Sequence, residues 1–358
     1  MCFIVPIVSI IPVNIACELI PLLHKNTQMS ALPVIAISIG DPNGIGLEVI
    51  LKTFNQPEVF DRCIPVIYGD FEHVKQEQQH FGTAAPIAAL EGVPSKGVLH
   101  VKSIWDQAPN VVYGAQESEA GRAAFLSLQA AVLAVQNGEA DALVTAPIHK
   151  ASIKSDAFPF AGHTHYLASI WGNKALMVLV HNNLRVALVT DHIPLSEVTK
   201  KLSKSLLFEK AQQLSKSLQN DFGCNTPKIA LLGVNPHAGD QGVIGSEDDL
   251  LLKPVVEQLH QEGMLLDGPF AADGFFGQKS YLKFDAVLSC YHDQGLVGFK
   301  TLAFGKGVNV TAGLPHVRTS PDHGTAFDIA GKGIANHASF TAAVEMACSI
   351  WNTRQKNL

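Results

Sequence analysis

The chain has 358 residues, of which 47% are hydrophobic and 16% charged, so it can bury a core and is not disordered as a whole. Its net charge of −6, from 26 basic and 32 acidic residues, leaves no broad basic surface for a nucleic acid. The six cysteines are scattered and form no CxxC pair, which is typical of the reducing cytoplasm.

The first 28 residues differ in composition from the rest of the chain. Its first seventeen residues, MCFIVPIVSIIPVNIAC, contain no charged side chain, and Glu18 is the first one. The segment therefore lacks the basic start of a signal peptide. Three prolines interrupt the segment, whereas a membrane helix needs about 20 apolar residues. We therefore expect no membrane role, with residues 1–28 as an extension outside the fold and Met29 as the functional start.

From Pro33 onward the pattern alternates between strands and helices. Short apolar runs that end in polar or glycine-bearing loops occur at 33–40, 62–69, 140–150, 174–192, 228–240 and 284–295. Amphipathic helices are predicted at 46–56, 117–139 and 205–222. This alternation predicts an α/β fold with a mostly parallel sheet covered by helices, and a domain boundary near residue 150.

Three histidines each follow a predicted strand. His192 comes after RVALVTD, His237 lies in LLGVNPHAGD, and His292 comes after AVLSCY. Their spacing excludes a local motif such as HExxH, so they can meet only through the fold. Three neutral imidazoles with an open position would form a catalytic site for Zn²⁺ or another divalent metal.

Other polar residues in loops suggest binding of a small anion. His163 and Thr164 in FAGHTHYLA can hydrogen-bond a ligand, although Thr164 could equally be a helix N-cap. Lys300, Asn309 and Arg318 offer two cations and an amide, which suit a carboxylate and a phosphate ester. The glycine-rich turn SIGDPNGIG does not match GxGxxG, so a Rossmann dinucleotide site is not supported.

An ordered set of motifs carries a family resemblance. SIGDPNGIG, VTAPIHK, FAGHTH, TDHIPL, NPHAGD, YHDQGL and GVNVTAGLPHVRTSPDHGTAFDIAGKG occur in that order. Together they resemble the 4-hydroxythreonine-4-phosphate dehydrogenases of vitamin B6 (pyridoxine) biosynthesis over about residues 33–350. The final part, DHGTAFDIAGKGIAN, is similar to the adenosine-binding loop of isocitrate and isopropylmalate dehydrogenases.

The resemblance implies a non-Rossmann fold with two α/β/α domains around a cleft. The first domain would span 29–150 plus about 311–358, and the second, about 151–310, would carry the metal and substrate ligands. It also implies a cytoplasmic homodimer whose subunits share their active sites.

Site roles follow from the resemblance residue by residue. His192, His237 and His292 match metal ligands, and in the family the third of them comes from the other subunit. The positions that match substrate-binding residues are His163, Thr164, Lys300, Asn309 and Arg318. The positions that match the NAD-binding segment are His323, Gly324, Thr325, Ala326 and Asp328. Lys300 could donate a proton, and Asp273 or Asp293 could act as a base or orient a ligand.

The implied reaction is an NAD-dependent, metal-dependent oxidation and decarboxylation. It converts 4-phosphooxy-L-threonine into 3-amino-2-oxopropyl phosphate, with zinc, or else magnesium or cobalt, as the metal. His165 stands where the family has glutamate and Leu47 where it usually has proline, so substrate preference stays open. The alternatives are a paralogous dehydrogenase of a 4-phosphorylated sugar acid (threonate or erythronate) and a phosphotransacetylase-like acyl transferase.

Overall fold

The computed structural model describes residues 32–105 and 108–357. The expectations for residues 1–28 and for a start at Met29 lie outside these residues. Among residues 32–105 and 108–357, no helix has both the length and the apolar character that crossing a membrane requires.

Twelve strands of the described chain form one sheet. In chain order they are β1 (Val34–Ser38), β2 (Ile64–Gly69), β3 (Ile87–Ala89), β4 (Leu99–Ser103), β5 (Ala142–Thr145), β6 (Leu176–His181), β7 (Leu184–Leu188), β8 (Lys228–Leu232), β9 (Leu265–Phe270), β10 (Ala286–Ser289), β11 (Val308–Ala312) and β12 (Val317–Pro321). Their order across the sheet is β3-β4-β2-β1-β5-β12-β11-β6-β7-β10-β8-β9. All six predicted strand regions contain strands.

The sheet has two parallel blocks joined by antiparallel strands. The strands β3-β4-β2-β1-β5-β12 run parallel to one another, and so do β7-β10-β8-β9. Between the blocks, β11 is antiparallel to β12 and β6, and β6 is antiparallel to β7. The prediction of a mostly parallel α/β sheet is confirmed. The division into two domains stays a prediction.

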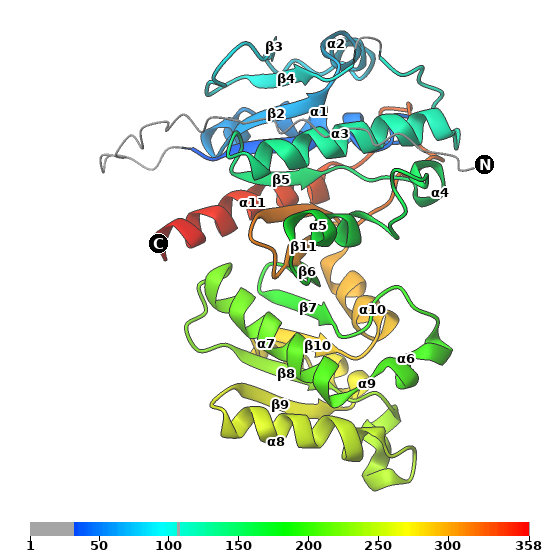
Figure 1. Cartoon of the computed structure of the whole chain (residues 1–358), viewed down its shortest axis with the longest axis vertical. Helices are drawn as coiled ribbons and strands as arrows, with labels where there is room; N and C mark the ends of the chain where they lie inside the picture. The colour runs from blue at the N-terminus through cyan, green and yellow to red at the C-terminus, as the bar shows by residue number, and fades with distance from the viewer. Residues whose placement is uncertain (1–31, 106–107, 358) are drawn as a thin grey trace, which may run out of the picture. The chain divides into compact units, whose positions relative to one another are not determined.

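Helices pack against the sheet along its length (Figure 1). They are α1 (Gly46–Phe54), α2 (Phe71–His80), α3 (Ser118–Gln136), α4 (Lys150–Ile153), α5 (His163–Trp171), α6 (Leu195–Lys201), α7 (Lys204–Asn220), α8 (Lys253–Gln261), α9 (Ala272–Gly277), α10 (His292–Ala303) and α11 (Ala338–Lys356). Short 3₁₀ or π turns lie at Pro57–Asp61, Pro236–Gly242, Asp248–Leu252 and Ser280–Lys283. The three helices predicted from apolar spacing correspond to α1, α3 and α7.

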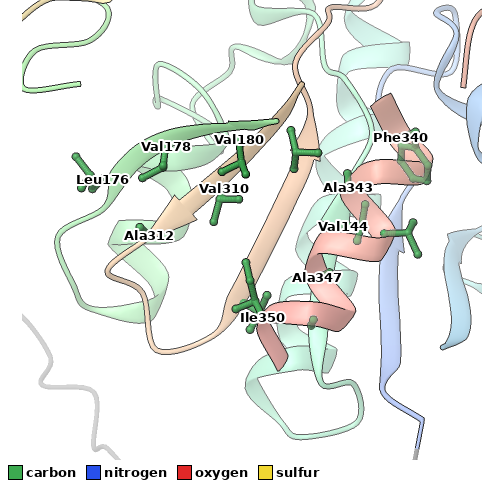
Figure 2. Close-up of a cluster of buried hydrophobic side chains, with 14 of the residues drawn as sticks. Val144, Leu176, Val178, Val180, Val310, Ala312, Phe340, Ala343, Ala347 and Ile350 are labelled. Atoms are coloured by element: carbon green, nitrogen blue, oxygen red, sulfur yellow. The ribbon is translucent and has the colours of Figure 1, made fainter. Parts of the chain in front are cut away.

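The central strands β6, β11 and β12 have two different faces. On one face, alternate side chains of β6 and β11 belong to the same buried cluster as side chains of α11, as Figure 2 shows for Val178, Val310 and Ala343. Because side chains alternate along a strand, Asn309 and Thr311 of β11 point to the opposite face. That second face is the more polar of the two, although it also bears Met177 and Leu179 of β6, and it carries the candidate site.

Candidate functional site

A cavity of about 280 Å³ lies over the polar face of the central strands. It brings together all five predicted substrate residues. They come from the start of α5 (His163, Thr164), from α10 (Lys300), from β11 (Asn309) and from β12 (Arg318). A larger groove of about 920 Å³ lies near the starts of β5 and β12. None of the predicted site residues lines it.

Arg318 is a buried cation at the floor of this cavity. Only 2% of the residue is exposed. Its Nη1 donates to Thr311 Oγ1 at 2.9 Å and its Nη2 to Thr145 Oγ1 at 2.6 Å, while Nε has no partner. Burial lowers the pKa of Arg318 to about 9. Since no ion pair of the described residues includes Arg318, the cavity offers a charge that an anionic ligand would balance.

The other substrate residues add polar atoms that lack protein partners. The Nε2 of His163 and the Oδ1 of Asn309 are both buried. Neither atom takes part in a hydrogen bond within the described chain. Burial holds the pKa of His163 well below its usual value, and the nearby cations Arg318 and Lys150 lower it further. The Nζ of Lys300 has one weak contact, to Asp322 O at 3.4 Å. These groups can all hydrogen-bond a small polar ligand.

His192 and His292 lie side by side at one edge of the cavity. They follow β7 and β10, which are parallel neighbours, and their ring centres are 5.5 Å apart. Two imidazoles bound to one ion at about 2.1 Å and a near-tetrahedral angle would place their ring centres roughly 5 Å apart. Burial lowers the pKa of His192, with Lys150 as the next cause, which favours the neutral form that a metal needs. This pair therefore has the chemistry of a metal site.

His237 lies apart from that pair. It follows β8, is exposed, and does not line the cavity. Within residues 32–105 and 108–357, no three His, Cys, Asp or Glu side chains come close enough to hold a metal. One chain thus brings together His192 and His292 only.

The two predicted catalytic aspartates lie outside the cavity lining. Asp293 is next to the histidine pair, because its Oδ1 lies 2.7 Å from His292 Nδ1. Its side chain is 82% exposed. Asp273 is an exposed residue in α9. Asp293 can therefore orient the ring of His292, whereas Asp273 is absent from the cavity lining.

The predicted nucleotide segment is divided between the cavity and the glycine-rich turn. His323 and Gly324 line the cavity, whereas Thr325, Ala326 and Asp328 do not. Thr325 O accepts a hydrogen bond from Ile45 N at 3.1 Å. A Cβ on Gly44 would lie only 2.9 Å from that oxygen, so the turn needs glycine to approach the segment.

The chain is similar to known proteins over most of its length. The family model described as pyridoxal phosphate biosynthetic protein PdxA matches residues 61–347. A 4-hydroxythreonine-4-phosphate dehydrogenase of Bacteroides thetaiotaomicron is 43% identical, and the match covers 90% of each chain. The crystal structure of a protein with the same name from Klebsiella pneumoniae matches with a TM-score of 0.79 and 32% identity, over 90% of this chain and 99% of that one. The chain belongs to the PdxA family.

The two departures from the family pattern lie in different places. His165 is exposed and lines the cavity, where it faces His192 closely enough to lower the pKa of that residue. Leu47 is 4% exposed and packs in the core. Only the change at His165 can therefore reach a ligand directly.

Several cavity residues were not predicted as site residues. Lys150, Thr145 and Ser320 all line the cavity. Lys150 and Thr145 lie in VTAPIHK, a motif already singled out, and Ser320 shares the face of β12 with Arg318. The alternative of a helix N-cap at Thr164 is wrong, because α5 begins at His163 with Gly162 as its N-cap.

Proposed function

We propose that this chain is an NAD-dependent 4-hydroxythreonine-4-phosphate dehydrogenase of pyridoxal phosphate biosynthesis. The reaction would convert 4-phosphooxy-L-threonine and NAD⁺ into 3-amino-2-oxopropyl phosphate, CO₂ and NADH. The observation that carries the proposal is the buried Arg318 without a counterion, in the cavity that gathers the five predicted substrate residues. The names of the relatives support it.

The cavity suits a small substrate with two anionic groups. Arg318, Lys300 and Lys150 are the lysine and arginine side chains of its lining, and no ion pair of the described chain includes them. The acidic residue in the lining, Asp322, directs its carboxylate toward Ser339 and Gly307 instead. A carboxylate and a phosphate ester would balance these cations and use the free atoms of His163 and Asn309.

The metal site would be shared between two copies of the chain. His192 and His292 of one copy would bind the ion, and we assign the third ligand to His237 of a second copy rather than to His292. The turn that carries His237 is followed by the exposed Val243 (80%), and the next turn, Asp248–Leu252, exposes Leu250 (63%), as expected of a surface that a second copy covers. This arrangement supports a homodimer with zinc, or else magnesium or cobalt, in its sites.

NAD would be held by the segment that begins at His323. Its first residues, His323 and Gly324, border the substrate cavity, so a bound nucleotide would lie beside the substrate. When bound, NAD⁺ would accept a hydride from the substrate, and the divalent metal would polarise the hydroxyl group of the substrate.

The chain's own residues would bind, orient and exchange protons. Arg318 and its two threonine partners would fix one anionic group of the substrate at the cavity floor. Asp293 would hold the Nδ1–H of His292 and so direct the Nε2 of that ring toward the metal. Lys300, which has no carboxylate partner, would donate the proton that replaces CO₂. A role for Asp273 as base would require a contact from another copy.

A substrate panel tests this function. NADH formation would be followed at fixed NAD⁺ and metal with 4-phosphooxy-L-threonine, with its hydroxy analogue 4-phosphothreonate, and with unphosphorylated 4-hydroxythreonine. We expect turnover of the first compound and at least tenfold lower kcat/KM for the other two. Preference for 4-phosphothreonate would instead support the paralogous dehydrogenase. Absence of NADH with all three would contradict dehydrogenase activity and leave the acyl transferase.

A further inference from the structure

The loop after β8 contains a left-handed turn that includes His237. Five successive residues have positive φ, from His237 (53°) and Ala238 (51°) through Gly239 (80°) to Asp240 (43°) and Gln241 (58°). L-residues avoid this region because the Cβ approaches the next carbonyl oxygen. Four of the five are not glycine, so the surrounding structure must hold the turn in place.

Asp248 is the residue that anchors this turn. It is completely buried, and its carboxylate accepts hydrogen bonds from Val234 N at 2.8 Å, from Asn235 N at 3.1 Å and from Asn235 Nδ2 at 3.0 Å. The first two donors are the backbone groups that lead into the turn. Gly239 lies against the same side chain, since a Cβ there would be 3.3 Å from Asp248 Oδ2. The carboxylate therefore bonds the entrance of the turn, and the middle of the turn packs against it.

We propose that Asp248 is a positioning residue that sets the strained turn and so presents His237 as a metal ligand. This inference rests on the proposed function, which makes His237 a ligand. Asp248 does not line the cavity and is fully buried, so it acts only through the backbone of residues 234–239. Without its charged acceptor, the backbone N–H groups of Val234 and Asn235 lose their partner, whereas Asn235 Nδ2 keeps its bond to Glu247 Oε2 at 2.8 Å. The turn is then free to relax to ordinary backbone angles.

A matched pair of variants tests the proposal. Asp248→Asn and Asp249→Asn each remove one negative charge at adjacent positions. Asp249 makes a salt bridge with Lys253 at 2.5 Å rather than bonding the turn. Binding of Co²⁺ to the full-length protein would be followed by its visible absorption, without substrate or NAD. We expect Asp248→Asn to weaken Co²⁺ binding by about 10- to 100-fold, and Asp249→Asn to change it less than twofold.

A rescue variant separates positioning from general stability. Ala238→Gly placed in the Asp248→Asn background should restore at least part of the Co²⁺ affinity, because glycine adopts left-handed angles without strain. If Asp248→Asn does not fold, Asn235→Ala removes the side-chain donor and leaves both backbone bonds, and a several-fold loss of affinity is expected. Equal affinities of the two aspartate variants, or no rescue by glycine, would overturn the proposal.

The same measurement distinguishes a failure of this inference from a failure of the metal assignment. His237→Ala and His192→Ala should each abolish tight Co²⁺ binding by the parent protein. If they leave it unchanged, the proposed metal site is wrong. If they abolish it while Asp248→Asn does not affect it, the metal site stands and the positioning role of Asp248 is wrong.

Discussion

Replacing Arg318 with methionine should make the ligand-free protein more stable and its substrate binding weaker. Methionine fills a similar space without charge, so the buried guanidinium is lost with little change in packing. The folded state lowers the pKa of Arg318 from 12.5 to about 9, and the cause is burial. Folding therefore disfavours the protonated side chain.

The magnitude follows from that difference. At pH 7 Arg318 is protonated in both the folded and the unfolded chain, so the full penalty of roughly 5 kcal/mol applies. This penalty for burying the protonated side chain decreases only as the pH rises through about 9. The variant leaves the hydroxyl groups of Thr145 and Thr311 without their donor, at about 1–2 kcal/mol each. The net gain in the free energy of unfolding is then about 1–3 kcal/mol, or roughly 2 °C of Tm for each kcal/mol.

Thermal unfolding with and without substrate provides the assay. The variant should have a higher Tm than the parent without ligand, and a smaller rise in Tm on adding substrate. Losing charge-assisted hydrogen bonds worth about 1.5–3 kcal/mol weakens binding by about 10- to 150-fold. Arg185→Met is the control, because Arg185 lies over the Phe222 ring away from the cavity. That variant should keep the full response to substrate.

A lower Tm for Arg318→Met, together with an unchanged response to substrate, would refute this reasoning. It would mean that Arg318 stabilises the fold through its two threonine contacts and does not bind the anion.

Four further predictions test other parts of the account. Lys300→Ala should lower kcat/KM for the phosphorylated substrate by about 10- to 150-fold, whereas a solvated surface lysine would give no change. Burial lowers the pKa of His163, so this side chain binds a proton in the unfolded chain before it does so in the folded protein. The free energy of unfolding should therefore decrease as the pH falls below about 6.5. In His163→Asn the slope of the unfolding free energy against pH should be smaller by about one proton. Gly121→Ala should lower Tm by several degrees, because a Cβ there would lie 2.0 Å from Ser152 O, where α4 packs on α3. A chain that begins at Met29 should keep the full kcat/KM, and a loss of activity would contradict the view of residues 1–28 as an extension.

The local pattern of the sequence predicted the elements well. Strands such as β1 and β10 are short apolar runs buried on both faces, and α3 and α7 have apolar residues at helical spacing. These signals depend on each segment alone. The order of the strands depends on contacts between distant segments, so the antiparallel strands at the centre of the sheet could not be derived from spacing.

The candidate site was predictable in part for the same reason. His192 and His292 follow parallel neighbouring strands, so the rule that polar residues gather at strand ends holds for them. His237 also follows a strand, but it lies in a left-handed turn and does not line the cavity that the pair borders. Spacing cannot reveal such a turn, since only one of its five residues is glycine.

The cavity floor follows the strand-end rule only at Thr145, which is the last residue of β5. Thr145, Arg318 and Ser320 lie on the polar face of the sheet rather than only in loops. Alternation within VRTSP places Arg318 and Ser320 on one face of the strand, and the sequence alone shows this. The sequence does not show which face α11 covers, because that depends on tertiary packing. Lys150 was missed because α4, which carries it, is held by packing against α3.

A crystal structure of the dimer with 4-phosphooxy-L-threonine and a divalent metal would test the proposed site most directly. The proposed function predicts that one anionic group of the substrate lies about 3 Å from the guanidinium of Arg318. It also predicts that His192 and His292 of one copy and His237 of the other bind the ion at about 2.0–2.3 Å. A substrate bound away from Arg318, or an ion held without this histidine pair, would contradict it.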